Sequence, residues 1–175
     1  AITVTDKDND QIRLDAGSFT VKIEDDIPAQ ATATVVANVD EDELTNGITD
    51  GDLELTTQSG SIAGLASVGA DQPGTFAFDL TGVTLPVLAS GGAAVSYAVV
   101  GGTLIAYTGA NPATVANQVF TVSLTSGGAY TVTLLKPVDH PTDSPINDDQ
   151  DLTIDLSGAI TVTDKDNDQI RLDAG

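Results

Sequence analysis

Short runs of β-forming residues follow one another along almost the whole chain. Valine and threonine dominate these runs, and glycine, asparagine, serine and proline separate them at intervals of about 8–12 residues, which is typical of β-sandwiches. No stretch has the sustained periodicity of an amphipathic helix. We therefore predict an all-β fold with strands at residues 2–5, 19–23, 32–39, 53–56, 75–80, 94–99, 103–107, 119–124, 130–135 and 152–156.

The sequence contains a long internal repeat. Residues 1–17 (AITVTDKDNDQIRLDAG) are identical to residues 159–175, a shift of 158 residues. Such a run of identities does not arise by chance, and the shift is long enough for a whole domain. We predict a tandem array in which residues 1–24 are the C-terminal hairpin of a preceding repeat and residues 25–175 form one repeat that lacks the end of its last strand. An accidental duplication is the alternative, and it has no evident purpose.

Charge is strongly unbalanced and unevenly distributed. Asp and Glu number 26 and Lys and Arg only 6, which gives a formal net charge of −20. This surface repels phosphate groups, so nucleic acid is excluded as a partner and anionic lipid is disfavoured, whereas cations are attracted. Without an apolar run of about 18 residues, direct membrane insertion is not expected. The chain has no Cys, which excludes disulfides and thiolate metal sites.

The acidic residues gather where predicted strands end. Residues 81–135 carry no charged side chain, and the acids concentrate at 6–10 and its copy 164–168, 24–26, 40–43, 50–52 and 139–155. The Asp-x-Asp-x-Asp spacing at 6–10 places three carboxylates in one short loop, which suits the oxygen-rich coordination of calcium. It is not an EF-hand, because Gln11 and Gly17 stand where that motif needs Gly and Glu. The plain alternative is an acidic hairpin turn.

An immunoglobulin-like, Greek-key order of strands would bring several of these clusters together. The last hairpin would then turn at residues 164–168, beside the linker at 24–28, and Glu41 would lie at the opposite pole and serve the next junction. We expect Asp164, Asp166 and Asp168 to share an ion with Asp25 or Asp26. The predicted Ca²⁺ ligands are Asp6, Asp8, Asp10, Asp25, Asp26, Glu41, Asp164, Asp166 and Asp168.

Several longer motifs carry a family resemblance. They are residues 39–44 (VDEDEL) with Gly47, 75–82 (TFAFDLTG), 130–141 (YTVTLLKPVDHP), 160–168 (ITVTDKDND) and the linker 25–28 (DDIP). In these motifs the chain resembles the tandem repeats of giant RTX-type adhesins, the biofilm-associated class exported by type I secretion. The resemblance implies a secreted, cell-surface, immunoglobulin-like extender domain that binds calcium at its junctions with neighbouring repeats and carries a ligand-binding tip.

The sequence leaves three classes of function open, which are a structural extender, a ligand-binding adhesin module and an enzyme. A structural extender is favoured over a ligand-binding adhesin module, because the unit is a near-identical repeat and aromatic residues are sparse. An enzyme is not expected, because the only histidine, His140, lies in the turn Asp139-His140-Pro141 with no second catalytic signal nearby. The three tyrosines are expected to pack in the sheets.

The repeat also predicts how the chain pairs with other copies. The sequence Ser-Phe-Thr-Val-Lys-Ile, present at 18–23, is expected to follow Gly175 and to complete the last strand. An unfilled strand exposes a sheet edge. We therefore expect residues 1–23 either to pack on another copy as a donated strand, giving a homo-oligomer, or to be poorly ordered.

Overall fold

The computed structural model describes residues 2–48, 51, 53–141 and 151–173, and in this part the fold is all-β. Helical geometry is limited there to single turns at Ala63–Leu65, Val115–Asn117 and Ser157–Ala159. The strands are β1 (Thr3–Thr5), β2 (Gln11–Arg13), β3 (Ala29–Gln30), β4 (Thr57–Ser61), β5 (Ala66–Ser67), β6 (Thr75–Phe78), β7 (Ala89–Ser90), β8 (Ala93–Ala94), β9 (Ser96–Val100), β10 (Thr103–Tyr107), β11 (Gln118–Leu124), β12 (Ala129–Leu134), β13 (Ile160–Thr163) and β14 (Gln169–Arg171).

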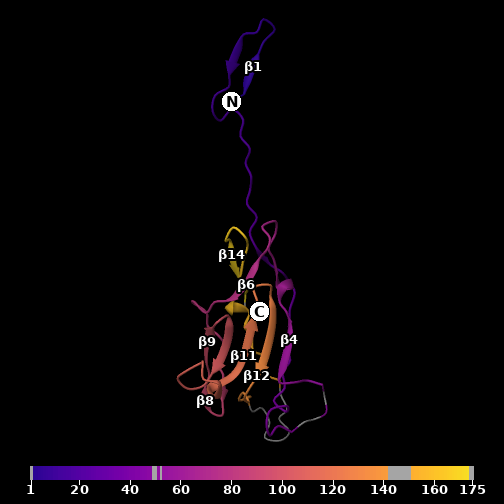
Figure 1. Cartoon of the computed structure of the whole chain (residues 1–175), viewed down its shortest axis with the longest axis vertical. Coiled ribbons are helices and arrows are strands. Elements are labelled where there is room, and N and C mark those ends of the chain that lie inside the picture. The colour runs from indigo at the N-terminus through magenta and orange to yellow at the C-terminus, as the bar shows by residue number, and fades with distance from the viewer. Residues whose placement is uncertain (1, 49–50, 52, 142–150, 174–175) are drawn as a thin grey trace.

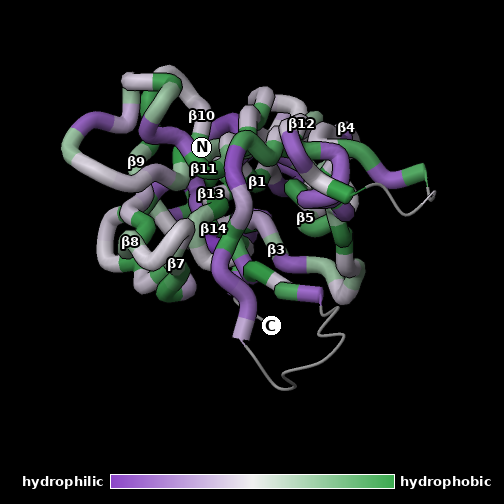
Figure 2. The backbone as a smooth tube through the Cα atoms, turned by 90° about the horizontal axis from the view of Figure 1, so that it is seen from below, coloured by the Kyte–Doolittle hydropathy of each residue, from purple (hydrophilic) through white to green (hydrophobic). Residues whose placement is uncertain are grey.

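Two antiparallel sheets enclose the core of the body. The larger sheet has the order β4-β12-β11-β10-β9 and the smaller has the order β14-β13-β6. Leu104 and Val119 from the larger sheet and Val162 from the smaller are fully buried in one apolar cluster. Apolar and polar residues are interspersed along the chain (Figure 2), as expected for strands with one face on a core. The predicted all-β class is confirmed, and the arrangement is compatible with a β-sandwich.

The central strands match the sequence pattern closely, whereas several outer runs form no strand. The run at 103–107 coincides with β10, but residues 19–23, 32–39, 53–56 and 152–156 lie outside the strands, so these four predictions are wrong. Ala37 and Val39 still pack against the core. Their backbone is held locally, since the N–H of Asn38 donates to the Gln58 side chain and the N–H of Asp40 to the carbonyl of Leu55. The alternation of apolar and polar residues in this segment therefore reflects burial of one side, without the hydrogen-bond ladder of a paired strand.

The first hairpin stands apart from the body. β1 and β2 pair with each other and lie at the end of an extended segment that joins the body near β3 (Figure 1). The second hairpin, β13–β14, is built into the smaller sheet through β6. Both hairpins have the same register, because Thr3 faces Arg13 in the first and Thr161 faces Arg171 in the second.

No helix in the described ranges has the length and hydrophobicity needed to cross a bilayer.

Candidate metal centre at the linker

The turn of the second hairpin holds three carboxylates close together. The N–H of Asp164 donates to the carbonyl of Asp168 over 3.0 Å, and the N–H of Asp168 donates to Oδ1 of Asp164 over 2.8 Å. Asn167 adopts a left-handed conformation with φ of 81°, which asparagine tolerates better than most residues. The loop therefore turns tightly, and Asp166 and Asp168 project from it beside Asp164.

The linker is fastened beside this turn by the loop that follows β5. β3 pairs with β5, and Oδ2 of Asp26 accepts the N–H of Ala70 over 2.8 Å. Gly69 has a φ of +67°, and a Cβ there would lie 2.1 Å from Oδ2 of Asp26, so only glycine fits. The N–H of Lys165 donates to the carbonyl of Asp71 over 3.1 Å, which ties the hairpin to the same loop.

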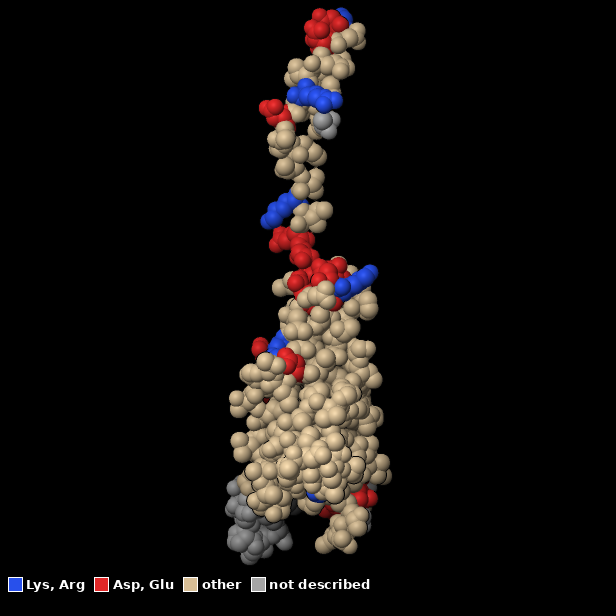
Figure 3. Space-filling view, turned by 60° about the vertical axis from the view of Figure 1, so that its left-hand side comes forward, with Lys and Arg blue, Asp and Glu red and all other residues tan. Residues whose placement is uncertain are grey.

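Carboxylates from the linker and the hairpin converge at this point. Oxygen atoms of Asp25, Asp166 and Asp168 lie within 4.8 Å of one another. Asp164 is 5% exposed, and its Oδ2 has no hydrogen-bond partner among the residues described. Figure 3 shows a cluster of acidic side chains where the linker meets the body, and most of the face below this cluster is uncharged.

The crowding of these groups shifts their protonation. The hydrogen bond that a protonated Asp166 makes with Asp164, together with desolvation and the charges of Asp164, Asp25 and Asp71, raises the pKa of Asp166 to about 6. Desolvation, followed by the charges of the same three residues, raises the pKa of Asp168. The site therefore carries excess negative charge that a bound proton or cation would relieve.

The donor set fits a hard cation. Every candidate ligand is a carboxylate oxygen, the type that calcium prefers, and the buried Oδ2 of Asp164 lacks the hydrogen bond that such an atom normally has. The residues that would hold the ion are Asp25, Asp166 and Asp168, with Asp164 and Asp71 adjoining them. This cluster could hold a metal ion.

The first hairpin repeats the turn but not its surroundings. Asp6, Asp8 and Asp10 also have carboxylate oxygens within 4.8 Å of one another, and all three residues are exposed. Oδ1 of Asp6 accepts the N–H of Asp8 and of Asp10. A side-chain hydrogen bond with Asp8 is the largest cause that lowers the pKa of Asp6, and backbone hydrogen bonds act in the same direction. No linker or body carboxylate joins this group in the described part of the chain.

The predicted ligands fall into three groups, which are Asp6, Asp8 and Asp10 in the first hairpin, Asp25, Asp26, Asp164, Asp166 and Asp168 at the linker, and Glu41 apart from both. The structure brings Asp25, Asp166 and Asp168 together beside Asp164. Asp26 lies next to them but is engaged with Ala70. Sequence reasoning missed Asp71, because a single acid between Ala70 and Gln72 matches no motif. Only the fold places it near the hairpin turn.

Glu41 lies away from the linker cluster, within residues 39–44, which form one of the motifs that carry the family resemblance. Its Oε1 accepts the N–H of Val138 over 2.7 Å and lies 3.4 Å from Nε2 of His140. The carboxylate thus helps to hold the Lys-Pro-Val-Asp-His-Pro segment against the body. Its role at a further junction stays a prediction. The predicted acids at 50, 52, 143, 148 and 149 lie outside the described residues.

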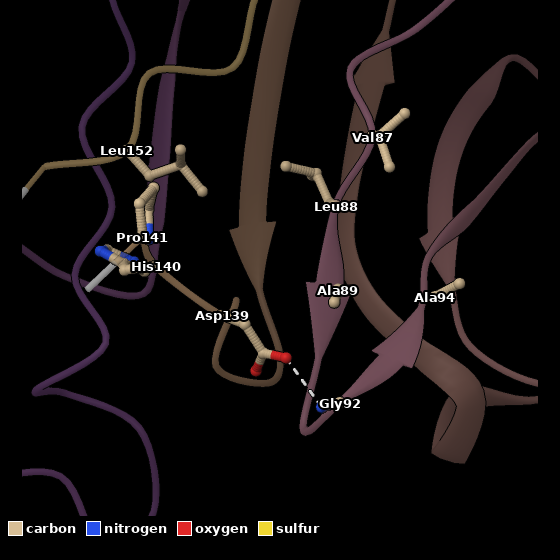
Figure 4. A pocket seen from close by; sticks show the side chains of 9 residues that line it. All are labelled: Val87, Leu88, Ala89, Gly92, Ala94, Asp139, His140, Pro141 and Leu152. Atoms are coloured by element: carbon tan, nitrogen blue, oxygen red, sulfur yellow. Dashed lines mark hydrogen bonds between the residues drawn. The ribbon is translucent and has the colours of Figure 1, made fainter. Parts of the chain in front are cut away.

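A shallow hollow of about 450 Å³ adjoins that segment (Figure 4). Its walls are mainly aliphatic, and its one carboxylate belongs to Asp139. The two oxygens of Asp139 accept the N–H groups of Gly91 and Gly92, each over 2.7 Å. Both glycines have positive φ, as tight hairpin turns require. The carboxylate therefore braces the β7–β8 turn.

Comparison with known proteins finds no significant match among curated proteins and none among solved structures. A family model does match residues 36–174, which include β4–β14 and the acidic turn of the second hairpin. The chain therefore belongs to the family described as domain of unknown function DUF5801.

Proposed function

We propose that this chain is a calcium-stabilised extender domain of a large, type I-secreted bacterial adhesin of the RTX type. Repeats of this kind would form a stalk on the cell surface and project a binding tip for adhesion or biofilm formation. One observation carries the proposal: Asp25 of the linker meets Asp166 and Asp168 of the last hairpin, beside the unpartnered Oδ2 of Asp164. A second support is the identical repeat, which makes the linker a junction between equivalent domains.

A cation at this place would couple the linker to the domain. Asp25 is separated by three residues from β3, which is already paired with β5. A ligand on each side of the junction would hold the segment that leads toward the preceding hairpin at a fixed angle. Without the ion, mutual repulsion of the carboxylates favours a looser arrangement. The proposed result is a string of domains that stiffens in calcium.

The proposal also accounts for the distribution of charge. The cytosol is poor in free calcium, so the acidic clusters would disfavour compact folding before export. Extracellular calcium modules bind with dissociation constants of about 10⁻⁴–10⁻³ M, which matches calcium levels outside cells. Binding to the folded form alone then stabilises that form by mass action.

Thermal unfolding in EDTA, in calcium and in magnesium tests this proposal. We expect EDTA to lower the melting temperature of the whole chain and calcium to restore it more fully than magnesium does, because magnesium demands a smaller, octahedral shell and retains water. Circular dichroism would follow the loss of β-structure. A melting curve that is the same in EDTA and in millimolar calcium would refute the calcium proposal.

A further inference from the structure

We propose that the β1–β2 hairpin is a docking element whose partner is the body of a second copy of this chain, where it takes the place of β13–β14. The two hairpins have the same sequence and the same register. One of them is seated in a body and the other is not. The seated hairpin therefore shows which surface the free hairpin fits.

The free hairpin presents the apolar face that the seated hairpin buries. Val4 is 49% exposed, whereas its counterpart Val162 is 0% exposed, and Leu14 is 36% exposed against 2% for Leu172. Ile2 and Ile12 complete the exposed face. Four aliphatic side chains on one small hairpin are costly to leave in water. The surface that covers them in the second hairpin is the core-facing side of the body.

The free hairpin also has an unpaired strand edge of the right kind. β13 pairs with β14 on one edge and with β6 on the other, where Thr163 faces Thr75. β1 pairs only with β2 among the described residues. The backbone groups on its other edge match those that β6 satisfies in the seated copy, and an open edge of this kind recruits another strand.

A charged contact adds specificity to the surface of the body that holds the β13–β14 hairpin. The guanidinium of Arg171 donates to the carboxylate of Asp79 over 2.6 Å and to the carbonyls of Asp79, Gly158 and Thr81. Arg13 is its counterpart in the free hairpin, and no such contact is formed by Arg13 in the described part of the chain. Docking would give Arg13 the oxygens of Asp79 and Thr81 on the partner body as acceptors, and several acceptors of this kind suit a guanidinium group.

Exchange of one hairpin for the other conserves most of the contacts, because the incoming hairpin makes those that the outgoing one gives up. The segment after the free hairpin carries Phe19, Val21 and Ile23, which are 73%, 71% and 88% exposed in the single chain. Their alternation suits a strand that continues β2 along the partner body. Docking would bury these side chains as well.

The arrangement predicts head-to-tail assembly. The hairpin extends along the long axis, away from its own body (Figure 1), so it can reach a second copy without folding back. Because the donated arm and the accepting body are different surfaces, the contact is heterologous, and an arm that extends away from its own body favours open chains over closed rings. Each contact would reproduce the junction between neighbouring repeats without a peptide bond.

Engineered cysteines would test the seat directly, because the chain has no native Cys. Facing residues of antiparallel strands have Cα separations of about 4.5–5.5 Å, within the range for a disulfide. In the full chain carrying Thr5→Cys and Thr75→Cys, we expect a ladder of disulfide-linked multimers on a denaturing gel. Thr5 is the counterpart of Thr163, which faces Thr75. The variant carrying Thr163→Cys and Thr75→Cys should instead link within one chain.

Three further variants separate docking from random collision. Thr5→Cys combined with Ser59→Cys, on the exposed strand β4, should give no ladder; an equal ladder would overturn the proposal, as would monomers alone from the first pair. By sedimentation, Val4→Lys should abolish assembly without lowering the melting temperature of the body. Gln11→Lys should leave assembly intact, since Gln11 and its counterpart Gln169 are both exposed. Equal assembly by the two lysine variants would also overturn it.

Discussion

The two hairpins of this chain place one 17-residue sequence in two surroundings. Their strands, register and left-handed asparagine are the same, with φ of 73° at Asn9 and 81° at Asn167. Their burial and chemistry differ. Asp6 is exposed and bonded within its own turn, whereas Asp164 is 5% exposed and stands among carboxylates of the linker and the body.

This difference separates what the local sequence determines from what the fold determines. The turn forms in both places, so its shape comes from the hairpin itself. The pKa of Asp166 is raised chiefly by Asp164 in the same turn and by desolvation, and Asp25 and Asp71, which lie far away in the sequence, add to the rise. The Asp-rich turn is therefore common to both hairpins, and the candidate site forms only where the fold places the linker beside the turn.

The largest expected effect contrasts Leu172 with Leu14. Leu172 is 2% exposed and Leu14 is 36% exposed. We expect Leu172→Ala to lower the free energy of unfolding by about 3 kcal/mol, because truncating a buried leucine leaves a cavity. Leu14→Ala should have little effect in dilute solution, where chains are separate. Urea denaturation of both variants measures this, and equal losses would contradict the unequal packing of the two hairpins.

The next contrast concerns calcium. Asp166→Asn should weaken calcium binding about tenfold or more, because a carboxylate ligand and its charge are lost from the cluster. Asp8→Asn makes the same change in the exposed turn and should leave the rise in melting temperature with calcium almost intact. Calcium titrations followed by thermal unfolding compare the two. A larger loss of calcium binding in Asp8→Asn than in Asp166→Asn would show that the principal site lies in the first hairpin and would contradict the proposed site.

A smaller effect is expected from the two arginines. Arg171→Ala removes the hydrogen bonds that join β14 to Asp79 and Thr81. It should lower the melting temperature, but by less than Leu172→Ala, because the ion pair is about one-third exposed and partly screened. Arg13→Ala should not change the melting temperature of dilute protein. A loss of the same size in both variants would show that the contact with Asp79 is not what matters.

The smallest expected effect is a dependence on pH in calcium-free buffer. The pKa of Asp166 is raised to about 6 in the folded chain, whereas an unfolded Asp titrates near 3.9. The folded state therefore holds the proton more tightly, and the stabilisation is lost as pH rises from about 4 to about 6. Asp79, whose pKa is lowered chiefly by hydrogen bonds from Thr81, acts in the opposite sense only at lower pH.

The melting temperature should accordingly fall between pH 4.5 and pH 7 without calcium, and saturating calcium should remove the fall because the cation replaces the proton. Asp166→Asn provides the control, since it has no proton to lose. A melting temperature that rises over this interval in calcium-free buffer would contradict the raised pKa.

The sequence predicts the centre of the fold better than its periphery. The run at 103–107 forms β10 because it pairs with β9 on one edge and with β11 on the other, and its three central residues are buried. At residues 32–39 and 152–156 the β-forming residues also predict strands, but those segments cover the core without a partner strand. Alternation reveals which side is buried and does not reveal whether a neighbour supplies a ladder.

The candidate site was partly predictable for a related reason. The Asp-x-Asp-x-Asp spacing predicts Asp166 and Asp168 as ligands, and the position of Asp25 in the linker predicts Asp25. Asp71 has no such signal, and the burial of Asp164 depends on packing of the hairpin against β6. Glu41 looked similar to these acids in sequence but lies beside Val138 and His140. Contacts between distant segments decided these three cases.

Amide NMR during a calcium titration tests the central claim most directly, because both hairpins report from the same molecule. We predict that the amides of Asp164, Asp166 and Asp168 shift together with those of Asp25 and residues 69–71, with one dissociation constant. The amides of residues 6–10 should shift only at higher calcium. Equal shifts with one constant in both turns would place binding in the hairpin alone, and the absence of any shift at 164–168 would contradict the site altogether.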